Sequence, residues 1–144
     1  MGSGESKPIV YFTLIEAKDI PKMDVMGKSD PYCLTSIHHP GERRKRNRKS
    51  KPFKSKRFTN TEHAKWNENY VFEAIDTEQD YIKVILKDHD TISKDDKIGT
   101  LKIPISLIEL KNGTTIEKWV EMNPAKGITG KAKLHYTIRV DFNP

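Results

Sequence analysis

The sequence predicts an all-β protein that folds as an eight-stranded antiparallel β-sandwich. Apolar residues recur with a period of two in most segments, and these segments are rich in β-branched and aromatic side chains. Clusters of Gly, Pro, Asp, Asn and Ser separate them at short intervals, as in sandwiches and barrels. The chain has 144 residues, which fits one domain, and we expect that domain to cover residues 8–144.

Each expected strand shows this pattern in turn. The predicted strands cover residues 9–16, 32–37, 55–59, 69–74, 81–87, 98–103, 115–121 and 133–141. The last is the clearest, because Leu134, Tyr136 and Ile138 alternate with polar residues. The segment 55–59 is the weakest. The helical signal is limited to about one turn within residues 106–110.

Composition excludes several classes of protein. No apolar run approaches the ~20 residues of a membrane-spanning helix, and residues 1–8 lack the apolar centre of a secretory signal. Residues 1–7 are expected to be a disordered tail or a cloning remnant, although they also fit the Met-Gly-x-x-x-Ser myristoylation pattern. Cys33 is the only cysteine, so we expect no internal disulfide, no cysteine-rich zinc site and a reducing, cytoplasmic location.

Positive charge is concentrated in one segment of the chain. Lys and Arg total 26 and Asp and Glu total 20, which gives a net charge of +6. Ten of the positive charges, and no acidic residue, lie within residues 43–57, the basic segment. Without those ten charges the net charge of +6 becomes −4. The protein is therefore a mildly acidic body that carries one basic segment.

Two loops between expected strands, residues 21–32 and 88–99, are rich in aspartate. Calcium takes about six to eight oxygen ligands at about 2.3–2.6 Å. Two carboxylates that are two residues apart in an extended chain point the same way. Converging carboxylates repel each other unless a cation lies between them, so the pattern predicts a calcium site. Its aspartates are Asp24 and Asp30 in the first loop and Asp88, Asp90 and Asp96 in the second.

Aspartate is also an ordinary turn residue, and each of these side chains could instead form an Asx turn. Two aspartate-rich loops in one small β chain leave the metal interpretation and the turn interpretation about equal. Neither loop has the twelve-residue spacing of an EF-hand, which argues against that kind of calcium site.

Several short motifs carry a resemblance to a known family. Residues 24–32 read Asp-Val-Met-Gly-Lys-Ser-Asp-Pro-Tyr, residues 66–68 read Trp-Asn-Glu, and Asp88-His89-Asp90 is followed by Asp96-Lys97-Ile98-Gly99. Together with Ala17-Lys18-Asp19-Ile20-Pro21 and Tyr70-Val71-Phe72, these motifs resemble the C2 domain, a calcium- and phospholipid-binding β-sandwich. The resemblance extends from about residue 8 to residue 142.

The resemblance implies a set of calcium ligands. The family's five calcium-binding aspartates fall on the five aspartates given above, all of which are present. The family's backbone-carbonyl ligands fall at or near Met23, His89 and Lys94. About two calcium ions are therefore the expected cofactor.

The chain departs from the family pattern in places. His63-Ala64 replaces the family's Asn-Pro before Trp66, which affects a turn rather than the metal site. The first strand leads straight into the first acidic loop, and the strand 133–141 closes the sheet at the C-terminus. This order resembles the second of the family's two circularly permuted topologies.

The basic segment has two interpretations. It could be a solvated loop, or it could contact anionic lipid headgroups, where each Lys or Arg contributes ~1 kcal/mol. The resemblance implies a lysine-rich patch that binds phosphatidylinositol bisphosphate in some relatives, but only half of it is present, since the other half falls near Glu73 and Ile75. Nucleic-acid binding is disfavoured because few aromatic residues interrupt the segment. The expected lipid contacts are Arg43, Arg44, Lys45, Arg46, Lys54 and Lys56.

The function expected from the sequence is calcium-dependent binding to anionic phospholipid membranes. The partners are phosphatidylserine, phosphoinositides as a further candidate, and the membrane surface itself, to which a cytoplasmic signalling or trafficking module is recruited peripherally. Val25, Met26 and Ile92 lie at the expected loop tips and could enter the headgroup boundary. The alternative is a protein-interaction module in which calcium is structural or absent. No nucleophile–base pair is visible, so we expect no enzyme activity, although the chain could be a fragment of a larger enzyme.

Overall fold

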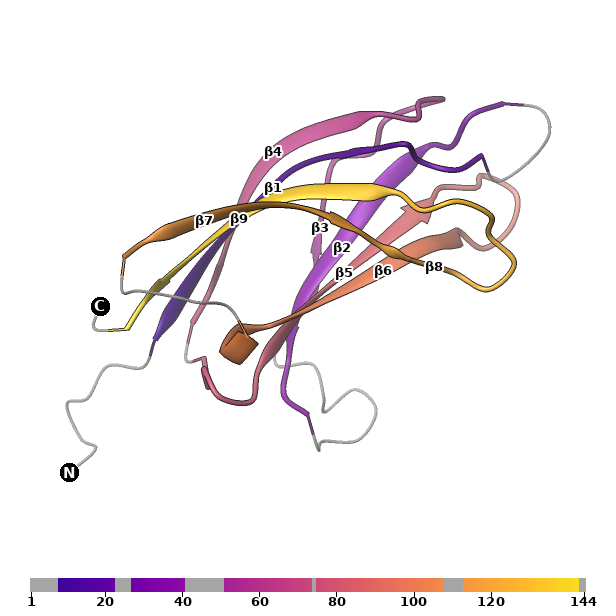
Figure 1. The fold of residues 1–144 in the computed structure, drawn as a ribbon. Coiled ribbons are helices and arrows are strands. Elements are labelled where there is room, and N and C mark those ends of the chain that lie inside the picture. The colour runs from indigo at the N-terminus through magenta and orange to yellow at the C-terminus, as the bar shows by residue number, and fades with distance from the viewer. Residues whose placement is uncertain (1–7, 23–26, 41–50, 74, 108–112, 143–144) are drawn as a thin grey trace.

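The computed structural model describes residues 8–22, 27–40, 51–73, 75–107 and 113–142. These residues form two antiparallel β-sheets that face each other (Figure 1). Their helical content is one 3-10 turn, Ile105–Leu107, and no helix among them is long and apolar enough to cross a membrane. The predicted all-β sandwich is confirmed.

The first sheet has four strands in the order β4-β1-β9-β7. Its first strand in the chain, β1, pairs along its length with the last strand, β9. The C-terminal strand therefore closes this sheet, as expected for the permuted topology. A bulge between Leu14 and Glu16 interrupts the pairing of β1 with both neighbours. The strand bounds are β1 Ile9–Lys18, β4 Ala64–Phe72, β7 Thr115–Glu121 and β9 Lys133–Asp141.

The second sheet has five strands in the order β3-β2-β5-β6-β8. Three long strands form its centre, and a two-residue strand lies at each edge. Such short edges leave little unpaired backbone to which another chain could add. The strand bounds are β2 Pro31–His38, β3 Phe53–Lys54, β5 Tyr81–Asp88, β6 Asp96–Pro104 and β8 Asn123–Pro124.

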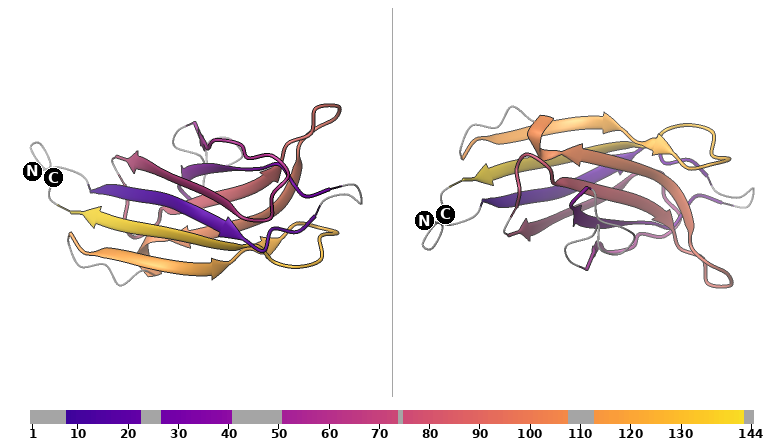
Figure 2. Two further views of the ribbon diagram at one scale, coloured as in Figure 1. Left: turned by 90° about the horizontal axis from the view of Figure 1, so that it is seen from above. Right: turned by 90° about the horizontal axis from the view of Figure 1, so that it is seen from below.

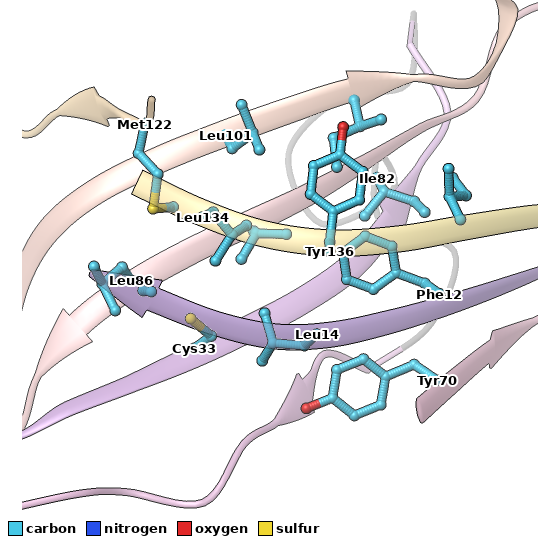
Figure 3. Packing of buried hydrophobic residues seen from close by; sticks show 14 of the residues in the cluster. Phe12, Leu14, Cys33, Tyr70, Ile82, Leu86, Leu101, Met122, Leu134 and Tyr136 are labelled. Atoms are coloured by element: carbon cyan, nitrogen blue, oxygen red, sulfur yellow. The ribbon is translucent and has the colours of Figure 1, made fainter. Parts of the chain in front are cut away.

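The hydrophobic core fills the space between the two sheets. Figure 3 shows Phe12 and Tyr136 of the first sheet packed in this cluster with Ile82 of the second. The rings of Phe12 and Tyr136 stack with their centroids 5.3 Å apart. Fully burying one such side chain stabilises the fold by about 1.5–3 kcal/mol. Cys33 is also fully buried, and burial raises the pKa of its thiol, so it is a core residue rather than a nucleophile.

The structure differs most from the predicted strands in three places, while the ends of β1, β2, β5 and β6 differ by one or two residues. The strand predicted at 69–74 begins five residues earlier, as β4, and β8 was not predicted. The strand predicted at 55–59 is displaced to β3. Ser55 explains this displacement, because its hydroxyl accepts the N–H of Cys33 at 2.8 Å and so interrupts the regular ladder. The predicted helical turn begins at Ile105 and ends, among the described residues, at Leu107. The predicted tail, residues 1–7, lies outside the described residues.

Candidate acidic loop site

Strand pairing brings the two acidic loops to one end of the sandwich (Figure 2). β2 begins beside the end of β5, where Pro31 lies opposite Asp88. β6 begins on the other side of β5, where Asp96 lies opposite Asp88. Asp30, Asp88 and Asp96 therefore stand at the ends of three neighbouring strands.

Hydrogen bonds tie the first loop to the second. The N–H of Asp30 donates to Oδ1 of Asp88 at 2.8 Å, and the N–H of His89 donates to the carbonyl oxygen of Asp30 at 3.0 Å. The N–H of Asn60 donates to Oδ1 of Asp30 at 2.6 Å. Asn60 has a positive φ of 53°, a conformation that asparagine adopts more readily than most residues. Its side chain accepts the N–H of Lys28 at 2.8 Å. Asn60 is therefore a part of this site that the sequence analysis did not identify.

Asp90 forms a turn within the second loop. Its Oδ1 accepts the N–H of Ile92 at 2.8 Å and that of Ser93 at 3.2 Å, and its Oδ2 accepts the Ser93 hydroxyl at 2.9 Å. These donors, led by the N–H of Ile92, lower the pKa of the Asp90 carboxyl. In this conformation the Asp90 side chain therefore stabilises a turn, which is the alternative role that the sequence allowed. The turn presents Ile92 to solvent, with 95% of that residue exposed.

Asp95 is a second site residue that the sequence analysis missed. Its Oδ1 accepts the N–H of Asp90 at 2.9 Å, and its other carboxylate oxygen accepts the Tyr32 hydroxyl. Nδ1 of His89 lies 3.4 Å from Oδ1 of Asp95. The Asp90 N–H and then the Tyr32 hydroxyl hold the pKa of Asp95 at about 2. The family resemblance implied that the neighbouring residue, Asp96, is the calcium ligand; Asp96 is exposed on β6.

The aspartates do not form a ready-made metal cage among the described residues, where no three His, Cys, Asp or Glu side chains are placed to hold one ion. Asp24 and the predicted carbonyl ligand Met23 lie outside the described residues. The available donors fit calcium chemically, because carboxylate and backbone oxygens are the ligands that calcium prefers. The loops supply no cysteine, and Cys33 is buried in the core, which disfavours a zinc–thiolate site.

The predicted lipid contacts are only partly described. Ile92, Lys54 and Lys56 are exposed, and Nζ of Lys54 lies 5.0 Å from the centroid of the Tyr32 ring. Nζ of Lys56 lies 5.3 Å from the centroid of the Phe58 ring. The contact with Tyr32 holds Lys54 beside the end of the first acidic loop, whereas Lys56 contacts a ring of its own segment. The remaining predicted contacts, Val25, Met26, Arg43, Arg44, Lys45 and Arg46, lie outside the described residues.

The second half of the basic segment runs along β2 toward the acidic loops. The N–H of Ser55 donates to the carbonyl of Cys33 at 2.9 Å, and that of Phe58 donates to the carbonyl of Pro31 at 3.0 Å. The other end of β2 is His38, which lies opposite Tyr81. Seven residue steps of about 3.3 Å separate Pro31 from His38, so β2 spans roughly 23 Å. The segment that follows β2 thus leaves from the end opposite the aspartates.

Comparisons with known proteins identify related sequences. A family model for the C2 domain matches residues 9–122. Synaptotagmin 1 of Drosophila melanogaster is 30% identical over 125 residues, which cover 85% of this chain and 24% of that protein. Synaptotagmin-1 of Caenorhabditis elegans is 32% identical over 114 residues, which cover 78% of this chain and 24% of that protein. The chain thus spans about a quarter of the length of these relatives.

Solved structures show the same fold. A C2 domain of plant Extended Synaptotagmin 1 superposes with a TM-score of 0.80 at 16% identity, over 97% of this chain and 98% of that one. The calcium-bound pair of C2 domains from Extended-Synaptotagmin 2 gives a TM-score of 0.72 at 25% identity, over 94% of this chain and 46% of that one. Human GIVD cytosolic phospholipase A2 gives a TM-score of 0.74 at 21% identity, over 96% of this chain but 17% of that enzyme. The likeness to the phospholipase therefore concerns a small, C2-like part of the enzyme.

Proposed function

Because the chain belongs to the C2-domain family, we propose that it is a module that binds anionic phospholipid membranes when calcium is present. It is homologous to the C2 domains of synaptotagmins and extended synaptotagmins. The observation that carries the proposal is the joining of the two acidic loops at one end of the sandwich, through the bond from Asp30 to Asp88. The exposed Ile92 lies at the tip of one of these loops.

The proposed calcium ligands are the five aspartates of the two loops, with backbone carbonyls at or near Met23, His89 and Lys94. Without a cation these carboxylates repel anionic headgroups. About two calcium ions would nearly cancel their charge and offer open coordination positions to lipid phosphate or carboxylate oxygens. Asp90 gives up the hydrogen bonds of its own turn when its carboxylate oxygens serve the metal. The carboxylate and carbonyl oxygens of these residues support this proposal.

The proposed lipid contacts surround the calcium ligands. Ile92, with Val25 and Met26 of the first loop, enters the headgroup boundary, where burial of apolar side chains is favourable. The basic segment, including Lys54 and Lys56, adds attraction to phosphatidylserine and phosphoinositides. Both actions fit a cytoplasmic module that is recruited peripherally to membranes.

The test is vesicle co-sedimentation across a calcium titration. Asp88→Asn keeps the size of the side chain but removes a proposed ligand charge, so calcium-driven binding to phosphatidylserine vesicles should be lost. Ile92→Asp leaves the ligands intact, so it should weaken membrane binding while calcium still stabilises the fold. The matched controls are Glu78→Gln, which removes an exposed acid elsewhere, and Val71→Asp, which places a new charge on the outer face of β4. Both controls should bind like the parent.

One observation favours the alternative, a protein-interaction module without calcium-driven docking. Both carboxylate oxygens of Asp90 accept hydrogen bonds from its own loop, which leaves them less available to a cation. If Asp88→Asn and Ile92→Asp both bind vesicles like the parent, the loops are not the docking surface and this alternative replaces the proposal.

A further inference from the structure

A hollow of about 250 Å³ lies on the outer face of the four-stranded sheet. The left-hand view of Figure 2 looks onto this face, where β4, β1, β9 and β7 lie side by side in that order. Tyr11 of β1 lies opposite Arg139 of β9 in the hollow, and Thr13 of β1 lies opposite Thr137 of β9. The residues that alternate with them on both strands are buried in the core, so these four side chains point outward.

Arg139 is the one charged residue among the described residues that line the hollow. It is half-buried, and its Cζ lies 4.1 Å from the centroid of the Tyr11 ring. A guanidinium that stacks on a ring uses its flat face for that contact and keeps the N–H groups in its plane for other partners. No carboxylate in the described part of the chain forms an ion pair with Arg139. Its positive charge is therefore available to a ligand.

The acidic residues nearest to Arg139 do not line the hollow. Glu117 of β7 is two residues beyond Thr115, which lies opposite Arg139, and its carboxylate is hydrogen bonded to Nε2 of His135. Asp141 is two residues beyond Arg139 on β9. The hollow itself thus carries a positive charge and no negative one.

The other polar groups of the hollow add hydrogen-bond donors to this charge. The hydroxyl of Thr13 donates to Oδ1 of Asn69 on β4 at 2.7 Å, which leaves the Nδ2 group of Asn69 as a donor. The hydroxyls of Thr115 and Thr137 also line the hollow, and neither has a hydrogen bond to another described residue. Each can donate one bond. Donors from β4, β9 and β7 therefore surround the guanidinium, which is an arrangement suited to an oxyanion.

The single guanidinium indicates a carboxylate as the ligand group. Arginine forms two parallel hydrogen bonds with a carboxylate, whose single charge it cancels. A phosphomonoester carries a charge of about −1.5 to −2 and would keep part of that charge here. Sites for free small molecules usually measure about 300–1,000 Å³ and bury about 70–90% of the ligand. This hollow is smaller and lies on an open sheet face, so the carboxylate belongs to a larger partner.

Exposed apolar side chains on the same face provide further contact area for such a partner. Val71 of β4 lines the hollow and is 45% exposed, and Trp119 of β7 is 44% exposed. The Trp119 ring is fixed by stacking on His135, with the centroids 4.4 Å apart. Aromatic residues of this kind are enriched in protein–protein interfaces.

We propose that this face binds a partner protein by capturing one of its Asp or Glu side chains in the hollow. Arg139 pairs with the carboxylate, and Asn69 and the two threonines of β7 and β9 complete its hydrogen bonds. The site is distant from the acidic loops, because Tyr11 precedes Lys18, the last residue of β1, by seven residues, or about 23 Å. The partner therefore binds without obstructing the loops.

The experiment follows the amide signals of the isotope-labelled full chain by NMR, in calcium-free buffer without lipid. The probe is the blocked peptide acetyl-Leu-Glu-Leu-amide. It should shift the signals of Asn69, Thr137 and Arg139 in a saturable way. The same peptide with Gln in place of Glu should leave them unchanged, because it carries no charge. Sodium acetate and inorganic phosphate should bind at least about tenfold more weakly than the peptide, because they lack its apolar contacts.

Three variants and a matched control test the residues of the hollow. Arg139→Gln should weaken binding of the Glu peptide by about tenfold to a hundredfold, and Arg139→Lys should restore only part of it, because lysine lacks the planar fork. Thr137→Val keeps the size and β-branched shape of the side chain, so it should weaken binding about two- to tenfold at an unchanged melting temperature. The control, Lys65→Gln, removes a positive charge from the same outer face outside the hollow and should bind like the parent.

Several results would overturn the proposal. The first is the absence of a saturable shift with the Glu peptide, and the second is unchanged binding by both Arg139→Gln and Thr137→Val. Equal binding of the Gln peptide would mean that apolar contact alone is measured. Equal affinity for acetate would assign the hollow to a free small acid, and tighter binding of phosphate would assign it to a phosphate group. Because calcium and lipid are absent, this result and that of the membrane-docking test are independent of each other.

Discussion

His135 lies between two carboxylates on the outer face of the four-stranded sheet. Its Nδ1 lies 2.8 Å from Oε2 of Glu16, and its Nε2 is hydrogen bonded to Glu117. The ring stacks on Trp119, with the centroids 4.4 Å apart. Burial by itself would lower the pKa of His135, but the hydrogen bonds to Glu16 and Glu117 outweigh it and raise the pKa. His135 and then His63 lower the pKa of Glu16.

These shifts predict how stability depends on pH. The raised pKa of folded His135 gives a stabilisation that is complete below its unfolded value of about 6.5 and is lost as the pH rises through the folded pKa. The lowered pKa of Glu16 gives a stabilisation that is present above about pH 4.5 and is lost as the pH falls through its folded pKa. The contribution of this cluster to the melting temperature should therefore be largest between about pH 4.5 and 6.5.

His135→Gln tests this assignment. The variant should lose the fall in melting temperature that the parent shows between about pH 6 and 8.5, because the titrating ring is gone. Thermal melts in calcium-free buffer measure the effect. A variant that keeps the parent's full slope in this range would show that another group titrates there.

At the level of single elements, the second acidic loop is fastened to β2 by a relay of hydrogen bonds. The Tyr32 hydroxyl donates to Asp95, Asp95 accepts the N–H of Asp90, and Asp90 accepts the N–H of Ile92. Tyr32 is itself buried, with 4% of the residue exposed. The loop is thus anchored to a rigid strand through one phenol.

Tyr32→Phe should loosen this loop. The acceptor of its hydroxyl, Asp95, is ionised. Loss of a hydrogen bond to such a charged group should lower the free energy of unfolding by about 1.5–3 kcal/mol. The amides of Asp90, Ile92 and Ser93 should also exchange hydrogen faster. Hydrogen-exchange mass spectrometry and urea unfolding measure the two effects. Tyr11→Phe is the control, because Tyr11 lies on the other sheet, where Arg139 stacks on its ring at 4.1 Å. Equal loop exchange in both variants would contradict the relay.

The elements also show what sequence reasoning can and cannot predict. β9 was predicted with its observed bounds because its alternation is unbroken and both of its neighbours are long strands. The start of β4 was missed because its outward positions are polar and include asparagines, which are common in turns, so the segment resembles a loop in sequence.

The five site aspartates could be predicted only in part. Pairing of β2 with β5 follows from the strand order, and this pairing places Asp30 beside Asp88. The role of Asp95 depends on Tyr32, which is 63 residues away in the chain. No local pattern records such a contact. Asp95 and Asp96 are identical residues next to each other in the sequence. Only the hydrogen bonds in the structure distinguish the role of Asp95 from that of Asp96.

Across the whole molecule, negative and positive charges are concentrated in separate places. The acidic loops occupy one end of the sandwich, and lysines occupy the outer face of β5 and β6. Because several carboxylates gather at the acidic end, a bound calcium ion should relieve the repulsion among them.

Calcium should therefore raise the melting temperature. A ligand at about 100 times its dissociation constant adds about 2.7 kcal/mol per site. For a domain of this size that is an increase of about 5–10 °C. Magnesium should give a much smaller increase, because it demands a tighter octahedral site. Differential scanning calorimetry in calcium, magnesium and chelator measures the effect, and Asp88→Asn should abolish it. An unchanged melting curve in millimolar calcium would refute the calcium site.

The pairing of β1 with β9 also determines how the domain can be tethered. Ile9 lies directly opposite Asp141, and both lie at the end of the sandwich away from the aspartates. A polypeptide, fluorescent label or solid support attached to either terminal strand would lie beside the other terminal strand. It would leave the acidic loops unobstructed. Tandem copies joined by a linker at this end would have their acidic loops directed away from the linker. Several loop pairs could then contact one surface together and gain avidity from their effective concentration.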